Sequence, residues 1–185
     1  VDLGSLDLIN IFDYSISAWF KTSTAAYGVI FNKVRSNIGW NLHIDGSGNP
    51  KFEHRVTAGS AVTVTWGSSL ADGSWHHVVI TGDRDGNLSM YIDGDTDNPI
   101  TSSIASLTQT INPNTSGEDG QVIIGKESND LSANLGVFNG SIDEVAIFQN
   151  RILSTSNVTA FYNSGAPKDL VAEANLVGYW RFDEG

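Results

Sequence analysis

Residues 72–94, DGSWHHVVITGDRDGNLSMYIDG, restrict the possible folds of this chain more than any other segment. Within it, residues 75–80 form an unbroken run of aromatic, histidine and β-branched residues, which is typical of a strand buried on both faces. The residues that follow alternate, and the apolar side of the alternation carries Leu88, Met90 and Ile92. Asp85-Gly86 predicts a tight turn with a positive φ angle, and Asp93-Gly94 predicts another turn. The segment therefore predicts an antiparallel hairpin whose first strand lies in the middle of a sheet.

Short strands with turn residues between them recur along most of the chain. Outside the hairpin, strands are expected at residues 14–22, 27–33, 38–44, 51–57, 61–66, 121–125 and 135–148. Ser154 is the expected N-cap of a short helix that stops near residues 165–167. This succession predicts an all-β fold, an antiparallel sandwich of two sheets, with one short helix toward the C-terminus.

The strand expected at residues 38–44 shows how the two faces are assigned. Successive side chains of a strand point to opposite faces. Trp40, Leu42 and Ile44 are therefore expected to point into the core. Asn41 and His43 are expected to point outward.

Two motifs resemble a known family. Residues 75–94 follow the pattern W-H-H-V-x-x-x-x-D-x-x-G-x-L-x-x-Y-I-D-G, and residues 140–148 are GSIDEVAIF, followed by NRILS at 150–154. Both resemble the laminin-G-like, concanavalin A-like jelly-roll domains, a group that also includes the pentraxins. The resemblance implies a two-sheet antiparallel jelly roll with one short C-terminal helix. It specifies a fold strongly and a ligand hardly at all.

The length of 185 residues suits one domain with a sizeable core, so we expect residues 1–185 to form a single laminin-G-like domain. In the family that it resembles, VDLG (residues 1–4) follows an opening strand of the type YW-x-F-D-E-G, which here occupies residues 179–185. Residues 176–185 are therefore either the closing strand of this domain or the start of a following repeat. We favour a closing strand, in a circularly permuted domain, because an unpaired segment would expose two aromatic rings. One face of that strand is expected to carry Leu176, Gly178, Trp180 and Phe182.

The charge balance narrows the class of partner. Ten Lys and Arg residues against 21 Asp and Glu residues give a net charge of −11. Such a charge repels nucleic-acid backbones and anionic membranes and favours cations, although a merely soluble surface has the same property. No apolar run approaches the ~20 residues of a membrane helix, so we expect neither a nucleic-acid partner nor membrane insertion. The chain has no cysteine, so disulfides cannot stabilise it and thiols give no sign of secretion.

Catalysis is considered because the concanavalin A-like superfamily also contains glucanases and polysaccharide lyases. Retaining glycosidases need two carboxylates roughly 5 Å apart, and the glucanase-like pattern E-x-D-x-x-E is absent. Asp143 and Glu144 are adjacent on one expected strand and so point to opposite faces. His76 and His77 lie inside a hydrophobic strand without a nucleophile motif nearby, which is typical of structural histidines. We therefore expect no enzymatic activity.

Calcium is the expected cofactor, because it selects the oxygen ligands in which these loops are rich. The loop after the strand at 121–125 is similar to the calcium-binding loop of pentraxins. By that resemblance Glu127 would bind the ion together with Asn129 or Asp130. Asn37 falls in the region that supplies further ligands in pentraxins. At most one ion is implied there.

A second calcium candidate joins the two ends of the domain. Related jelly-roll modules tie their first and last strands with a structural calcium ion, and by that resemblance Asp143 would bind it with Asp183 or Glu184. A second interpretation is that Asp143 caps a turn or pairs with Arg151 or Arg181. Both interpretations stay open on the sequence alone.

A carbohydrate ligand requires an aromatic ring beside polar side chains. The aromatic residues near expected loops are Trp66, Trp40, Tyr27 and Phe138, and their polar neighbours are His43, His54, Arg35 and Arg55. None of them stands out, so the ligand-binding residues are unknown at this level. The resemblance implies a non-catalytic, extracellular binding or adhesion module, at a cell or virion surface, that belongs to a larger multidomain protein and recognises a glycan or a protein. The alternatives are a structural repeat or decoration domain of a large surface, phage or virion protein, and a divergent glycan-cleaving enzyme.

Overall fold

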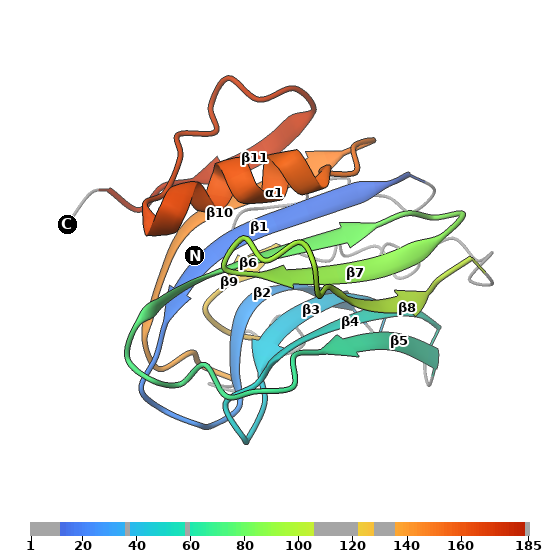
Figure 1. The fold of residues 1–185 in the computed structure, drawn as a ribbon. Coiled ribbons are helices and arrows are strands. Elements are labelled where there is room, and N and C mark those ends of the chain that lie inside the picture. Colours follow the sequence, from blue (N-terminus) through green and yellow to red (C-terminus); the bar gives the residue numbers. More distant parts are fainter. Residues whose placement is uncertain (1–11, 36–37, 58–59, 106–121, 128–135, 184–185) are drawn as a thin grey trace.

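The computed structural model describes residues 12–35, 38–57, 60–105, 122–127 and 136–183, and within them two antiparallel sheets form two layers (Figure 1). The strands of the six-stranded sheet, in spatial order, are β11 (Leu176–Trp180), β10 (Ser141–Gln149), β1 (Tyr14–Lys21), β6 (Trp75–Gly82), β7 (Asn87–Ile92) and β8 (Ile100–Ser103). Those of the five-stranded sheet are β5 (Ser60–Thr65), β4 (Pro50–Thr57), β3 (Ile38–Ile44), β2 (Gly28–Arg35) and β9 (Ile123–Ile124). The predicted all-β, two-sheet sandwich is confirmed.

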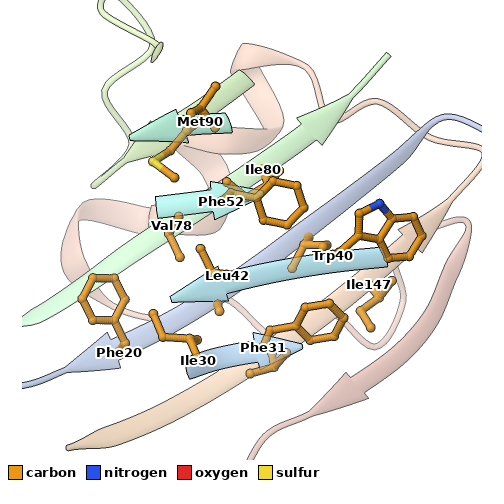
Figure 2. Close-up of a cluster of buried hydrophobic side chains, with 14 of the residues drawn as sticks. Phe20, Ile30, Phe31, Trp40, Leu42, Phe52, Val78, Ile80, Met90 and Ile147 are labelled. Atoms are coloured by element: carbon orange, nitrogen blue, oxygen red, sulfur yellow. The ribbon is translucent and has the colours of Figure 1, made fainter. Parts of the chain in front are cut away.

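The main hydrophobic core fills the space between the two sheets. Figure 2 shows side chains of β2, β3 and β4 lying against side chains of β1, β6, β7 and β10. The fully buried members with the largest volume include Phe20, Phe31, Phe52, Leu42, Ile80 and Met90. Burying one such side chain contributes about 1.5–3 kcal/mol, so this layer supplies most of the stability of a chain without disulfides.

The hairpin at residues 72–94 takes the predicted central place, because β6 lies between β1 and β7 and is buried from its second residue onward. The prediction for one of its turns was wrong. Asp93 and Gly94 have positive φ angles of 51° and 74°, but Gly86 is absent from the positive-φ residues of the described chain. The hairpin is closed by the loop between Asp83 and Asn87, which is longer than the predicted two-residue turn. A Cβ on Gly86 would lie 2.5 Å from the carboxylate of Asp83. A larger residue there would require the Asp83 carboxylate to move, but would not have to adopt a left-handed backbone.

The helix α1 (Thr155–Tyr162) lies on the outer side of the six-stranded sheet (Figure 1). Ser154 is its N-cap as predicted: its Oγ accepts from the Asn157 N–H, and its own N–H donates to Asn157 Oδ1. A 3-10 turn follows, η1 (Asn163–Gly165). Val158 and Phe161 bury themselves in a second apolar cluster between the helix and the sheet. No helix in the described ranges is long and apolar enough to cross a bilayer.

β11 lies antiparallel to β10, with Val145 opposite Trp180 and Ala146 opposite Tyr179. The segment thus pairs with a strand of this chain, and its assignment as a closing strand stays a prediction. The expectation that its apolar residues share one face was wrong, because the register shifts between Ile147 and Phe148. Trp180 packs against the main core, whereas Leu176 packs against the outer cluster.

One strand is missing from the sequence-based prediction. β8 pairs with β7 at the edge of the six-stranded sheet, within a stretch that shows only weak periodicity. Its residues alternate between half-buried and exposed, which is why the apolar signal is faint.

Candidate functional site

A polar pocket of about 350 Å³ opens on the side of the five-stranded sheet that points away from the core. It is lined by Tyr27, Asn32, Val34, Asn41, His43, Lys51, Glu53, Arg55 and Glu127. We call it the sheet-face pocket. It arises because the outward positions of neighbouring strands fall in line: Asn32 of β2 lies opposite Asn41 of β3, which lies opposite Glu53 of β4.

A chain of side-chain hydrogen bonds holds one half of this pocket in place. The Asn32 amide donates to Asn41 Oδ1 at 3.0 Å, and the Asn41 amide donates to the Tyr27 hydroxyl at 3.4 Å. Tyr27 in turn donates to Glu127 Oε1 at 2.6 Å. A Cβ on Gly136 would come within 3.0 Å of both Tyr27 and Glu127, so glycine is required behind this wall. Because each group orients the next, the polar atoms are fixed before a ligand arrives.

Charged groups of β4 form the other half. Glu53 accepts from Arg55 at 2.6 Å and pairs with Lys51 at 3.0 Å. Burial raises the pKa of Glu53, but hydrogen bonds from Arg55 and Lys51 outweigh burial and leave that pKa below its usual value. Glu53 is therefore ionised at neutral pH, with its charge balanced inside the pocket.

His43 lies between the two halves, and its ring lies 5.0 Å from the ring of Tyr27. Burial lowers its pKa, an effect that the nearby Glu53 charge only partly offsets. The imidazole is thus neutral at pH 7. Its Nδ1 atom is buried and has no hydrogen-bond partner among the described residues.

Only some of the residues predicted for a carbohydrate site lie together in the structure. Tyr27, His43 and Arg55 come together in the sheet-face pocket. The others lie elsewhere: Trp40 and His54 are buried in the core, and Trp66 and Phe138 pack partly buried against it. The side chain of Arg35 lies outside the described residues.

Four polar lining residues escaped the sequence analysis. They are Asn32, Asn41, Lys51 and Glu53. The outward position of Asn41 was predicted correctly, but its neighbours across the sheet depend on strand register. Alternation gives the face of a residue, and only register brings residues of different strands together.

The first calcium candidate is only partly visible. Glu127 borders the sheet-face pocket, whereas Asn37, Asn129 and Asp130 lie outside the described residues. One carboxylate oxygen of Glu127 already accepts the Tyr27 hydroxyl. The described residues contain no group of three or more acidic, histidine or cysteine side chains suited to a metal ion. This candidate stays a prediction.

The second calcium candidate has a competing cation. The charge of Asp183 raises the pKa of Asp143, so these two acids lie within electrostatic range of each other. Asp183 pairs with Arg181 at 2.8 Å, while Glu184 lies outside the described residues. Asp143 Oδ1 accepts from the Glu144 N–H at 2.8 Å, in a bulge where Glu144 has a φ angle of 48°. Because the cation of Arg181 already pairs with Asp183, a calcium ion would have to compete with it here, and this candidate also stays a prediction.

The two histidines of the central strand, His76 and His77, do not line the sheet-face pocket. His77 is 1% exposed, and its Nε2 lies 2.8 Å from Ser17 Oγ. His76 contacts Asp93 at 2.8 Å and Asp72 at 3.2 Å. These contacts are those of structural histidines.

Comparisons with known proteins bear on this architecture. Residues 1–159 match the laminin G-type family described as the concanavalin A-like lectin/glucanases superfamily. No curated protein matches the sequence.

Solved structures with a similar fold include toxin domains. The binding domain of botulinum neurotoxin DC, in complex with rat synaptotagmin II, is 20% identical, with a TM-score of 0.63, over 83% of this chain and 36% of that chain. The ligand binding domain of botulinum neurotoxin serotype D, in complex with N-acetylneuraminic acid, is 18% identical, with a TM-score of 0.62, over 87% of this chain and 37% of that chain. The chain thus spans little more than a third of either domain, and the likeness shows a shared fold. Since the family match covers most of its residues, the chain belongs to the concanavalin A-like lectin/glucanases superfamily.

Proposed function

We propose that this chain is a non-catalytic module that binds a glycan in the sheet-face pocket. The observation that carries the proposal is the lining, where the Tyr27 ring, 41% exposed, stands beside fixed amide, carboxylate and guanidinium groups. A sugar ring has apolar C–H faces and hydroxyls that donate and accept, so it is complementary to such a lining. A volume of about 350 Å³ suits the end of a saccharide chain.

The similar structures support a glycan ligand. One contains N-acetylneuraminic acid bound to a type D toxin domain, and another concerns a type C toxin whose cell entry depends on two ganglioside molecules. Protein recognition is the second candidate, because a further similar domain is bound to synaptotagmin II. Because glycans and receptor proteins of this kind lie on cell surfaces, we propose that the module acts outside the cell, at a cell or virion surface. We propose that it serves there as an adhesion domain of a larger protein.

The charge state of Glu53 supports binding without cleavage. A glycosidase needs one carboxylic acid that stays protonated until it donates to the leaving group. Arg55 and Lys51 hold the pKa of Glu53 below its usual value, against the effect of burial, which excludes Glu53 from that role. Glu127 is engaged by the Tyr27 hydroxyl.

Replacing Tyr27 by alanine should weaken glycan binding by about tenfold, because the aromatic wall and the hydroxyl that positions Asn41 are both lost. The measurement is a glycan array with neutral and sialylated structures, followed by calorimetry with the strongest hit. Trp75→Ala is the matched control, because Trp75 is 42% exposed, similar to Tyr27 at 41%, but lies on the other sheet.

Equal losses in the two variants would contradict the sheet-face pocket as the site. An array without hits would contradict the glycan proposal and leave a protein partner or a spacer role. Release of reducing sugar from a polysaccharide panel would contradict the non-catalytic part.

We also propose that calcium binds near Glu127. Saturating calcium at about 100 times its Kd would add about 2.7 kcal/mol to the free energy of unfolding, which corresponds to a rise in Tm of roughly 5–10 °C. Thermal melting with calcium and then with a chelator measures this shift. Glu127→Gln should remove it, whereas Asp85→Asn, an exposed acid on the β6–β7 turn, should not. An unchanged Tm of the wild-type protein on addition of calcium would contradict calcium binding to the folded chain.

A further inference from the structure

A second pocket lies on the outer side of the six-stranded sheet. Its volume is about 270 Å³, and it is lined by Trp19, Trp75, Asp143, Gly165 and Pro167. We call it the tryptophan pocket. It shares no residue with the sheet-face pocket and belongs to the opposite sheet, so it is independent of the proposed glycan site.

Strand register and the segment after α1 build this pocket. Trp19 of β1 lies opposite Asp143 of β10 on one side and opposite His77 of β6 on the other. Its ring stacks on His77 at 5.0 Å and on Tyr162 at 5.8 Å, so Trp19 forms a fixed wall. Trp75 stands at the beginning of β6 with 42% of its surface exposed. An indole is therefore presented to solvent directly beside the pocket.

Asp143 is the single charged group in this lining. Its Oδ1 accepts the Glu144 N–H, and no described lysine or arginine forms an ion pair with it. Arg181, whose charge influences Asp143, pairs with Asp183 at 2.8 Å and with Asp169 at 3.5 Å. Burial raises the pKa of Asp143 and outweighs the Glu144 N–H and the charge of Arg181, which lower that pKa, while the charge of Asp183 adds to the rise. Among the described residues, Asp143 thus forms no ion pair of its own, and the nearby Arg181 is engaged by Asp183 and Asp169.

We propose that the tryptophan pocket binds a primary alkylammonium group, carried by a free amine or by a lysine side chain. The ammonium pairs with Asp143 and lies against the indole faces, which attract cations. Its alkyl stem lies along Trp75 and Pro167. A sugar fits this pocket less well, because one carboxylate can satisfy few of its hydroxyls. The net charge of −11 favours approach of a cation.

Titration with n-butylammonium chloride, followed through indole N–H signals in ¹H–¹⁵N spectra, tests the proposal. The chain has five tryptophans, and we expect the signals of Trp19 and Trp75 to move while the others stay in place. Sodium chloride at equal ionic strength should move neither signal. n-Butanol, which has the same stem without the charge, should bind about tenfold more weakly. Stronger binding of N-acetyl-lysine-methylamide than of butylammonium would assign the lysine side chain as the source, and equal binding a free amine.

Two variants separate the carboxylate from the rest of the fold. Asp143→Asn should lower butylammonium affinity about tenfold, and Asp85→Asn, which changes the net charge equally, should leave it unchanged. Equal binding of butanol and butylammonium, or equal affinity in the wild type and Asp143→Asn, would overturn the proposal. It would also fail if calcium, and not the amine, moved the signals of residues around Asp143. None of these outcomes depends on glycan binding at the other sheet.

Discussion

Deletion of residues 176–185 should lower the free energy of unfolding by on the order of 5 kcal/mol, a large part of the 5–15 kcal/mol typical of a domain. The deletion removes β11, whose Trp180 packs against the main core. It also removes the Tyr179 hydroxyl, which donates to the Glu144 carboxylate and accepts the Leu170 N–H. β10 would lose its partner along one edge and expose a row of backbone groups.

Urea unfolding followed by near-ultraviolet circular dichroism measures this loss. A shorter deletion, of residues 183–185, is the control: it keeps β11 and, among the described contacts, removes the exposed ion pair between Arg181 and Asp183, so we expect no measurable change. If the long deletion behaves like the short one, residues 176–185 belong to a following repeat. Recovery of stability on adding a peptide of residues 176–185 would support the closing strand directly.

The faces of a regular inner strand such as β3 were predictable from the sequence, whereas the face of the bulged β11 and the sites were not. Asn41 and His43 point outward as their alternation with Trp40 and Leu42 predicts. The sheet-face pocket needs more than alternation, because it requires Asn41 to lie between Asn32 and Glu53. Those pairings depend on loop lengths and on bulges such as the shift between Val29 and Phe31. Local patterns carry no signal for such shifts.

Two turns with the same composition show a second limit. Asp93-Gly94 and Asp85-Gly86 are the same dipeptide, but only the first has positive φ angles at both residues. At the other turn, the Asp83 carboxylate accepts the Asp85 N–H. The Asp83 N–H donates to the Asn87 carbonyl, so the loop between the paired residues is longer than the dipeptide. The hydrogen bond from the Asp83 side chain distinguishes this turn, and a prediction from the Asp-Gly dipeptide alone does not take Asp83 into account.

The second large effect is a loss of stability in mild acid. Burial lowers the pKa of both His54 and His77 from 6.5 to about 3. Between these pH values the unfolded chain binds a proton at each histidine and the folded chain does not, so stability falls as pH falls. The two histidines together should cost on the order of 4 kcal/mol between pH 7 and pH 5. Buried His43 acts in the same direction.

Local contacts explain why neither ring accepts a proton. Arg84 Nη1 donates to His54 Nε2 at 3.3 Å, so the neutral ring must donate from Nδ1 to the Tyr14 hydroxyl at 2.7 Å. A proton on Nε2 would face the guanidinium. His77 is stacked on Trp19, and its Nδ1 has no partner in the described chain. A charge on this ring would be buried without compensation.

Urea unfolding between pH 5 and pH 7 tests this explanation. His54→Gln and His77→Gln should each remove roughly 2 kcal/mol of the pH dependence, whatever they do to stability at pH 7. Phe52→Leu is the control, because it weakens the core without removing a titrating group and should keep the wild-type slope. The described carboxylates whose pKa values lie below normal lose their stabilising effect only near pH 4, below this window; they are Asp45, Glu53, Asp72, Asp95 and Glu173. A wild-type slope preserved in both histidine variants would mean that other groups take up the proton, and that the interior around β4 and β6 admits charge more readily than its burial implies.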